Sequence, residues 1–116
     1  MAITEAYAMS AVTISTTEIS IVSGTSTLQT ITVAGVYQLF VDGVTNMAKG
    51  DEFKIRIYEK VLSGGTKRVV FSASLSDVQS ENFVTPTLIL MNGWDMTIIK
   101  VGGTDRAFSA SIRKVA

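Results

Sequence analysis

The sequence predicts an all-β fold: a single-domain antiparallel β-sandwich or jelly roll of about eight or nine short strands. Apolar residues recur at every second position through much of the chain, which is the spacing of strands with one buried face. Turn sequences that contain glycine separate these runs at short intervals. The chain also lacks the apolar periodicity of a long helix, and its 116 residues are enough for one core.

The amino-terminal third is rich in Ser and Thr and contains little charge, a composition that favours extended segments over helix. Regular alternation begins only near Val12. We therefore expect residues 1–11 to form an extended amino-terminal arm and residues 12–116 to form the sandwich domain. Ile3, Tyr7 and Met9 give the arm apolar surface for docking on a neighbour, and a disordered terminus is the alternative.

The strands expected in chain order cover residues 12–15, 18–22, 28–33, 36–42, 53–61, 67–75, 87–91, 94–101 and 106–115. The first two could also be one interrupted strand. The segment 53–61 alternates most clearly, with apolar side chains on one face and polar ones on the other, namely Phe53, Ile55, Ile57 and Val61 against Lys54, Arg56, Tyr58 and Lys60.

Connections between the strands are also visible in the sequence. Residues 45–51 should form a tight connection with one helical turn at 46–49. Three later turns have the composition of β-hairpins, Ser63-Gly64-Gly65-Thr66, Asn92-Gly93 and Gly102-Gly103-Thr104-Asp105.

The composition argues against catalysis. The chain contains no His and no Cys, so it has neither a side chain that ordinarily titrates near neutrality nor a thiolate nucleophile or soft metal ligand. Asp51-Glu52, with Asp42 upstream, could suggest the carboxylate pair of a glycoside hydrolase, but adjacent strand residues face opposite ways. The Ser63 to Lys67 loop lacks the spacing of a phosphate-binding loop. We expect no catalytic residues, no metal site and no cofactor.

Some strands are apolar on both faces. Residues 88–91 are apolar at four successive positions, and Ile98 and Ile99 repeat this on the next strand. Such strands need a second cover, which could be the arm, another subunit or the domain's own loops. Trp94 is either a core anchor or an interface residue. The interface candidates are Ile3, Tyr7, Met9, Leu88, Leu90, Trp94 and Ile99.

A second candidate surface is basic. Lys54, Arg56 and Lys60 share a face with Tyr58, and Arg68 is expected on the partner strand, a combination that in some sheets binds single-stranded nucleic acid. Ten basic residues balance ten acidic ones, however, and only one aromatic joins the stripe. We therefore interpret it as a polar surface that faces solvent or protein, and expect no nucleic-acid partner. No apolar run approaches the ~20 residues of a membrane span, so we expect no membrane partner either, and no signal segment.

Two stretches resemble a known group of proteins: GVYQLFVDGVTNMAKGDEFKIRIYEKVLSGGTKRVV (35–70) and LILMNGWDMTIIKVGGTDRAFSASIRKVA (88–116). They are similar to small β-rich structural proteins of tailed-phage virions, especially head decoration or cement proteins. The resemblance implies a sandwich or jelly-roll fold, no enzyme activity, location in the virion after assembly in the host cytoplasm, and binding to the major capsid protein or other virion proteins.

The doubly apolar strands at 88–91 and 98–99 and the low charged fraction of 17% predict a homo-oligomer. A trimer is the first choice because capsid lattices offer local three-fold positions. The alternatives are a tail, adaptor or fibre-base component, and a carbohydrate-binding or receptor-binding module. The last of these would call for several exposed aromatic side chains.

Overall fold

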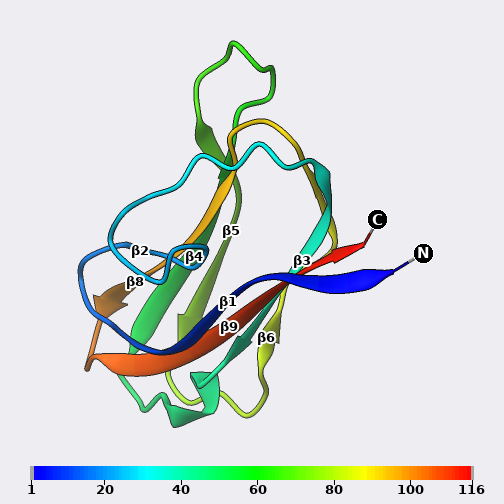
Figure 1. Cartoon of the computed structure of the whole chain (residues 1–116). Helices are drawn as coiled ribbons and strands as arrows, with labels where there is room; N and C mark the ends of the chain where they lie inside the picture. The colour runs from blue at the N-terminus through cyan, green and yellow to red at the C-terminus, as the bar shows by residue number, and fades with distance from the viewer. Residues whose placement is uncertain (1, 116) are drawn as a thin grey trace.

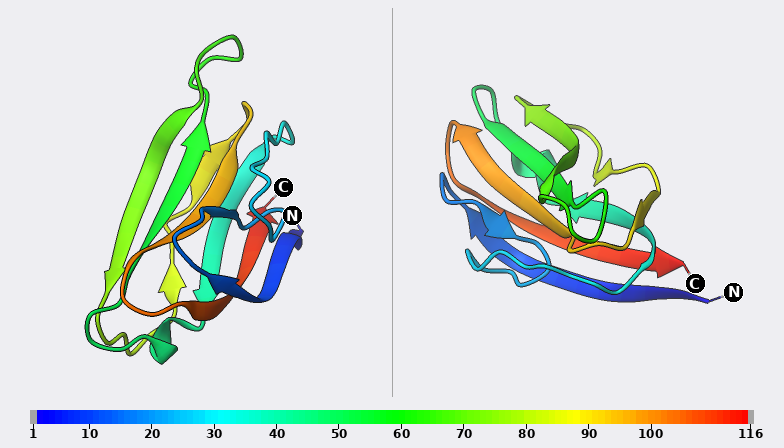
Figure 2. Two further views of the ribbon diagram at one scale, coloured as in Figure 1. Left: turned by 90° about the vertical axis from the view of Figure 1, so that its left-hand side faces the viewer. Right: turned by 90° about the horizontal axis from the view of Figure 1, so that it is seen from above.

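The structure, a computed structural model, describes residues 2–115 and confirms the all-β fold class. Its elements in chain order are β1 (Ile3–Ile14), β2 (Ile19–Ser20), β3 (Gly35–Asp42), the 3-10 turn η1 (Val44–Asn46), β4 (Glu52–Glu59), β5 (Arg68–Ser76), β6 (Phe83–Val84), β7 (Leu88–Leu90), β8 (Asp95–Gly102) and β9 (Arg106–Val115). Two antiparallel sheets face each other and form a sandwich (Figures 1 and 2).

The strand order is that of a jelly roll. Sheet A has the order β1-β9-β3-β6, with β7 also paired to β3, and sheet B has the order β2-β8-β4-β5. Early strands thus lie between or beside late ones in both sheets, as in double-sheet jelly rolls. The termini lie side by side because Ile3 pairs with Val115. The β4–β5 hairpin projects beyond the sheets at one end, and η1 lies at the opposite end (Figure 1).

The core fills the space between the sheets with large side chains. Trp94, Tyr37, Phe53 and Phe108 are its largest fully buried members. The rings of Phe53 and Phe108 meet edge to face, with centroids 4.8 Å apart, an arrangement that aromatic pairs favour. Among the described residues, no buried side-chain nitrogen or oxygen lacks a hydrogen-bond partner. Large apolar side chains thus occupy the interior, and its buried polar side-chain atoms are hydrogen-bonded.

The expected arm is wrong as a separate segment, because residues 3–14 form β1 and pair along β9. Two register shifts, after Glu5 and after Met9, interrupt the pairing. The second lets Met9 and Ile14 both point into the core although one is at an odd and the other at an even position. A strand with such a bulge loses its period-two pattern, and for this reason the alternation did not identify β1 before Val12.

Other boundaries also differ from the prediction. Residues 28–33 contain only one bridge, between Ile31 and Trp94, and β6 was not expected. The helical turn lies at 44–46 instead of 46–49. Val61 was assigned to the buried face of β4, but β4 shifts register after Ile57 and ends at Glu59, so Val61 lies exposed in the hairpin loop.

Candidate binding surfaces

Most of the predicted interface residues belong to the core. Met9, Leu90 and Trp94 are buried, and they are not available to a partner in this fold. Tyr7 is half-buried and meets the Trp94 ring edge-on, with centroids 5.9 Å apart. Leu88 and Ile99 are also half-buried, and of the seven candidates only Ile3 is largely exposed. The buried aromatic and apolar side chains that suggested an interface instead pack between the two sheets.

The second cover over β8 comes from the chain itself. Asp95 lies on the face of sheet B that points away from the core, yet it is fully buried, because residues 18–29 cross over it. Its carboxylate accepts hydrogen bonds from the Ser20 hydroxyl at 2.7 Å and from the Gln29 backbone N–H at 2.9 Å. Burial raises the pKa of this carboxyl above its ordinary value, and these hydrogen bonds oppose the rise. This cover lies over Asp95, while Ile89 and Met91 of the doubly apolar run stay exposed.

The basic residues do not form one continuous stripe. Arg56 lies 3.7 Å from the Glu18 carboxylate, which also accepts a hydrogen bond from the Tyr58 hydroxyl at 2.8 Å. Burial, followed by this hydrogen bond, raises the pKa of Tyr58. Glu18 thus neutralises the middle of the predicted stripe and occupies its only aromatic hydroxyl. Lys54 lies further along the same strand and is half-buried.

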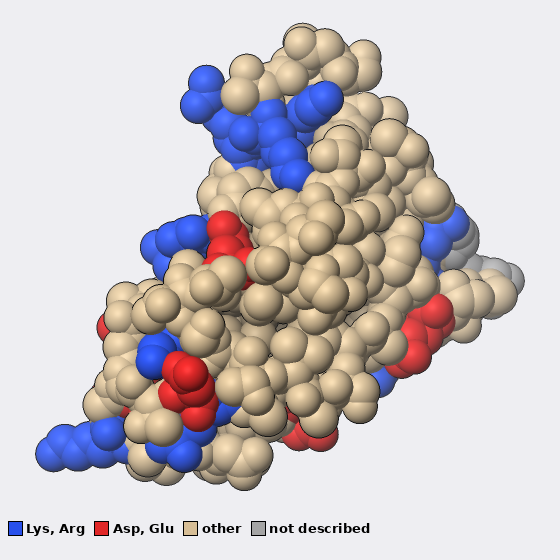
Figure 3. All heavy atoms as spheres, turned by 60° about the vertical axis from the view of Figure 1, so that its left-hand side comes forward, with Lys and Arg blue, Asp and Glu red and all other residues tan. Residues whose placement is uncertain are grey.

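Lys60 and Arg68 instead lie at the base of the projecting hairpin, together with Lys67. Lys67 donates to the Gln29 carbonyl oxygen and stands over the Tyr58 ring. Neither Lys60 nor Arg68 forms a salt bridge within the described part of the chain. Figure 3 shows Lys and Arg side chains gathered next to the projecting end of the molecule. This end is basic although the whole chain is neutral.

The same hairpin carries exposed apolar side chains. Val61 is 82% exposed and Leu62 is 73% exposed. With Val69 and Val70 at the start of β5 they line a groove of about 450 Å³, which Glu59 and Arg68 also border. We refer to the four apolar residues as the hairpin patch. Sequence reasoning missed it because Val61 continued the alternation of β4; the adjacent Ser63-Gly64-Gly65 turn was the available sign that the strand had ended.

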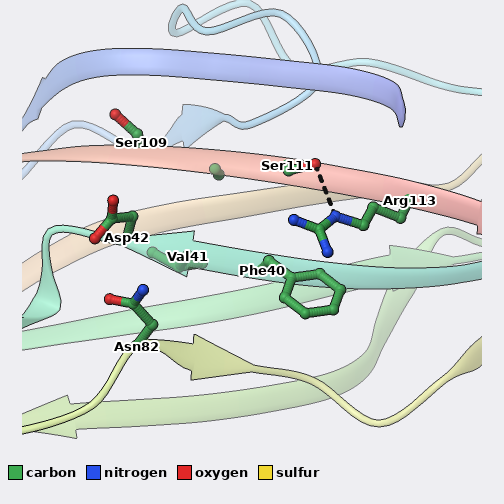
Figure 4. Close-up of a pocket in the computed structure, with 8 residues that line it drawn as sticks. Phe40, Val41, Asp42, Asn82, Ser109, Ser111 and Arg113 are labelled. Carbon is green, nitrogen blue, oxygen red and sulfur yellow. Dashed lines mark hydrogen bonds between the residues drawn. The ribbon is translucent and has the colours of Figure 1, made fainter. Parts of the chain in front are cut away.

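A second hollow, of about 280 Å³, lies on the outer face of sheet A (Figure 4). Its side chains alternate with buried ones along β3 and β9, so they point away from the core. Phe40 and Arg113 stand at one end, with the guanidinium carbon 3.9 Å from the ring centroid. Asp42 and Asn82 stand at the other end. Sequence reasoning did not select this face, because its residues come from three separated segments.

The acidic motif considered for catalysis is divided by the fold. Asp51 is buried and accepts hydrogen bonds from the backbone N–H groups of Ala48 and Thr104, both at 2.9 Å, and from Arg106 Nε at 2.8 Å. These contacts, the backbone ones first, lower the pKa of Asp51 to about 2. Asp51 therefore joins two loops and faces no solvent-filled cleft. In the described residues no cluster of three or more His, Cys, Asp or Glu side chains could hold a metal ion.

No helix in residues 2–115 has the length and apolar character needed to cross a membrane. No protein-family model matches the chain, and no curated protein matches it either.

Solved structures resemble it at low sequence identity. The mitogen of Yersinia pseudotuberculosis aligns with a TM-score of 0.51 at 11% identity, over 99% of this chain and 85% of that one. A pilus protein of Bacillus endospore appendages has a TM-score of 0.44 and 16% identity, over 89% of this chain and 79% of that one. A xylan-binding domain of CBM 22 has a TM-score of 0.44 and 12% identity, over 85% and 64% of the respective chains. At these identities the first similarity speaks only to the sandwich fold.

Proposed function

We propose that this protein is a non-enzymatic structural protein of a phage virion, a decoration protein that binds the outer surface of the capsid and stabilises it. One observation carries the mode of attachment. The hairpin patch exposes Val61 and Leu62 in the loop between β4 and β5, which projects from the sandwich. Apolar side chains gathered at such a point are typical of protein interaction sites. The sequence resemblance to decoration proteins supports the virion assignment.

The energetics of this patch suit attachment to a lattice. Fully burying one exposed Val or Leu side chain contributes about 1.5–3 kcal/mol. A patch of four such residues, after the loss of translational and rotational freedom, gives a weak single contact. If the protein self-associates, as we expect, several hairpins would engage the repeating capsid surface at once, and effective concentration would convert weak contacts into tight binding.

The charge around the patch defines the partner surface. Arg68 and Glu59 both line the groove. Glu59 Oε1 already accepts hydrogen bonds from the backbone N–H groups of Met91 and Asn92, whereas Arg68 has no salt-bridge partner among residues 2–115. We infer an apolar depression bordered by Asp or Glu on the major capsid protein, because complementary rims steer association and fix its orientation. Attachment should therefore weaken as ionic strength rises.

The proposed role requires no chemistry and no cofactor. Asp51, the centre of the acidic motif, is held by the hydrogen bonds of two loops and by Arg106. A carboxylate with a pKa of about 2 is a poor general acid or base near neutral pH. The chain's lack of His removes the usual alternative.

Co-sedimentation with DNA-free capsids, assembled from the major capsid protein of the same phage, tests the proposal. Wild-type protein should sediment with the particles. Val61→Ser combined with Leu62→Ser should weaken the affinity for the capsid at least tenfold, about 1.4 kcal/mol, and so lower the bound fraction. Val78→Ser is the matched control, because Val78 is 70% exposed in a different loop. Absence of wild-type binding would refute the capsid role, and equal binding by the hairpin variant would refute the patch.

The second structural alternative, a tail, adaptor or fibre-base component, is distinguished by the same assay. Purified tails replace the capsids, and the hairpin variant and its control remain the same. Sedimentation with tails and not with capsids would reassign the protein within the virion.

A further inference from the structure

The hollow on the outer face of sheet A exists because two small side chains of β9 lie between larger ones. Ser109 and Ser111 occupy successive outward positions on β9, between the large side chains of Phe40 and Arg113 at one end and the Asp42 and Asn82 pair at the other. The gap they leave is about 280 Å³. This is near the lower end of the size of small-molecule sites, which is about 300 Å³, so it fits one small ring.

The hydrogen-bonding groups around this space are partly unused. Asp42 Oδ1 accepts from the Gly43 backbone N–H at 2.8 Å, and Oδ2 has no partner among the described residues. Ser109 Oγ accepts from the Ala11 backbone N–H at 2.9 Å and keeps its own proton to donate. Ser111 donates to Glu5 at 2.6 Å and is already engaged. The Asn82 amide forms no hydrogen bond within residues 2–115 and offers both a donor and an acceptor.

Arg113 adds fixed donors at the other end. Its Nε points to Ser111 Oγ at 3.4 Å (Figure 4), and its guanidinium carbon lies 3.9 Å from the centre of the Phe40 ring. Stacking on an aromatic ring holds a guanidinium in one plane. The remaining N–H groups of Arg113 are free to donate, and the Phe40 ring supplies apolar surface beside them.

The charge of the lining favours a neutral ligand. Asp42 contributes one negative charge and Arg113 one positive charge, and the other lining side chains are uncharged. An anion bound at Arg113 would share this small hollow with the Asp42 carboxylate at its other end, which would repel it. A ligand rich in hydroxyl groups satisfies both, because each hydroxyl can donate to a carboxylate and accept from a guanidinium or amide.

We propose that this hollow is a binding site for a single ring of a neutral saccharide. Asp42 and Asn82 bind neighbouring hydroxyls at one end, Ser109 and Arg113 donate to the ring from the sheet, and the Phe40 edge contacts its C–H surface. The lining contains one carboxylate, whereas glycoside hydrolysis ordinarily uses two. The site therefore binds and does not cleave. It lies on sheet A, separate from the hairpin patch, and does not depend on the capsid assignment.

The test is a titration of the full-length protein with methyl glycosides of glucose, galactose, mannose and N-acetylglucosamine. Each sugar is added up to about 50 mM, because we expect a single ring to bind with a Kd of the order of 1 mM or above. Backbone amide NMR shifts are the readout. At least one sugar should shift the amides of Asp42, Asn82 and Ser109 in a saturable way. Asp42→Asn and Asn82→Ala should each weaken the response about tenfold or more. Glu81→Ala is the control, because Glu81 is exposed beside Asn82 and does not line the hollow.

Three outcomes would overturn the proposal. The first is no saturable shift with any of the sugars. The second is sugar binding that shifts amides elsewhere or that Asp42→Asn and Asn82→Ala leave unchanged. The third is tighter binding of inorganic phosphate than of any sugar at the same amides, which would make the hollow an anion site. Thermal unfolding of each variant verifies that a lost response does not reflect lost folding.

Discussion

Tyr37 and Trp94 donate hydrogen bonds to the same acceptor, the backbone carbonyl oxygen of Val33. The Tyr37 hydroxyl lies 2.8 Å from this oxygen and Trp94 Nε1 lies 3.1 Å from it. The two rings are also in contact, with centroids 4.5 Å apart and planes inclined by 51°. Tyr37 belongs to β3 in sheet A, while Trp94 immediately precedes β8 in sheet B. This triad therefore ties the two sheets and the segment before β3 together.

The shared acceptor predicts non-additive substitutions. Tyr37→Phe alone should lower the free energy of unfolding by about 1 kcal/mol, because Trp94 still satisfies the carbonyl. Trp94→Phe should have a larger effect, below the ~3–5 kcal/mol typical of Trp to Ala. The double variant should differ from the sum by about 0.5–3 kcal/mol. Urea unfolding measures all three, and Tyr7→Phe is the control. Strict additivity would contradict the shared role.

These aromatic residues also show how far the sequence could lead. Alternation, apolar runs and hairpin turns identified the strands that became β3, β4, β5, β7, β8 and β9. In β3, β4 and β9 buried side chains occupy every second position over most of the strand. These patterns failed at β1, where a bulge changes the phase between Met9 and Val12. Composition cannot locate such a bulge. Ala11, which lies in it with a φ of 49°, has its backbone N–H bound by Ser109, a residue 98 positions away.

The candidate sites were less accessible to sequence reasoning. Trp94 and Leu90 are residue types that occur both in cores and at interfaces, and only the packing of the two sheets shows that they are buried in the core. The hollow on sheet A joins Asp42, Asn82 and Ser109 from three segments, and their proximity depends on the pairing of β3 with both β9 and β6. Such a long-range juxtaposition leaves no local pattern in one sequence.

Deletion of residues 1–10 should damage the fold. It removes the buried Met9, the Tyr7 contact with Trp94 and most of the pairing to β9. Loss of one buried Met side chain alone costs about 2–5 kcal/mol, and β9 would become an exposed edge prone to association. Circular dichroism melting and light scattering measure the two effects. Ile3→Ser is the control, since Ile3 is exposed. A deletion variant that melts like wild type would show that β1 before Val12 is dispensable.

Asp51 should stabilise the protein at neutral pH and lose this effect in acid. Its folded-state pKa is about 2, below the ordinary 3.8, because backbone N–H groups and Arg106 bind the carboxylate. The stabilisation is thus complete above pH 4 and disappears as the pH falls towards 2. Asp51→Asn should lower the urea midpoint strongly at pH 6 and much less near pH 2. Glu81→Gln is the control variant, because Glu81 is exposed. A constant difference would indicate that the charge of Asp51 does not matter.

Asp95 should have the opposite pH dependence. Burial raises its folded-state pKa, so the folded protein holds this proton more tightly than the unfolded chain does. The resulting stability is present below the ordinary pKa of 3.8 and is lost as the pH rises through the raised value. Asp95→Asn should therefore be most destabilising, relative to wild type, in acid, with a difference that narrows towards neutral pH. Widening of the difference with rising pH would contradict the burial effect.

Self-association is the last prediction, and the structure limits which residues can carry it. Within the doubly apolar run at 88–91, Leu90 points into the core, while Ile89 is 78% and Met91 54% exposed. Ile89 pairs with Val36 of β3 on the outer side of sheet A. We expect a trimer, in keeping with the local three-fold positions of a capsid lattice.

Light scattering at micromolar concentration should give the mass of the trimer for wild type, and Ile89→Ser with Met91→Ser should shift it towards the monomer. Val101→Ser is the matched control, because Val101 is 54% exposed elsewhere on β8. The hairpin variant Val61→Ser with Leu62→Ser should stay trimeric, since the proposed capsid contact and the self-contact use different side chains. A monomeric wild-type protein, both free and bound to particles, would refute self-association; a trimer that only the hairpin variant dissociates would place the self-contact on the hairpin and leave the capsid contact to another surface.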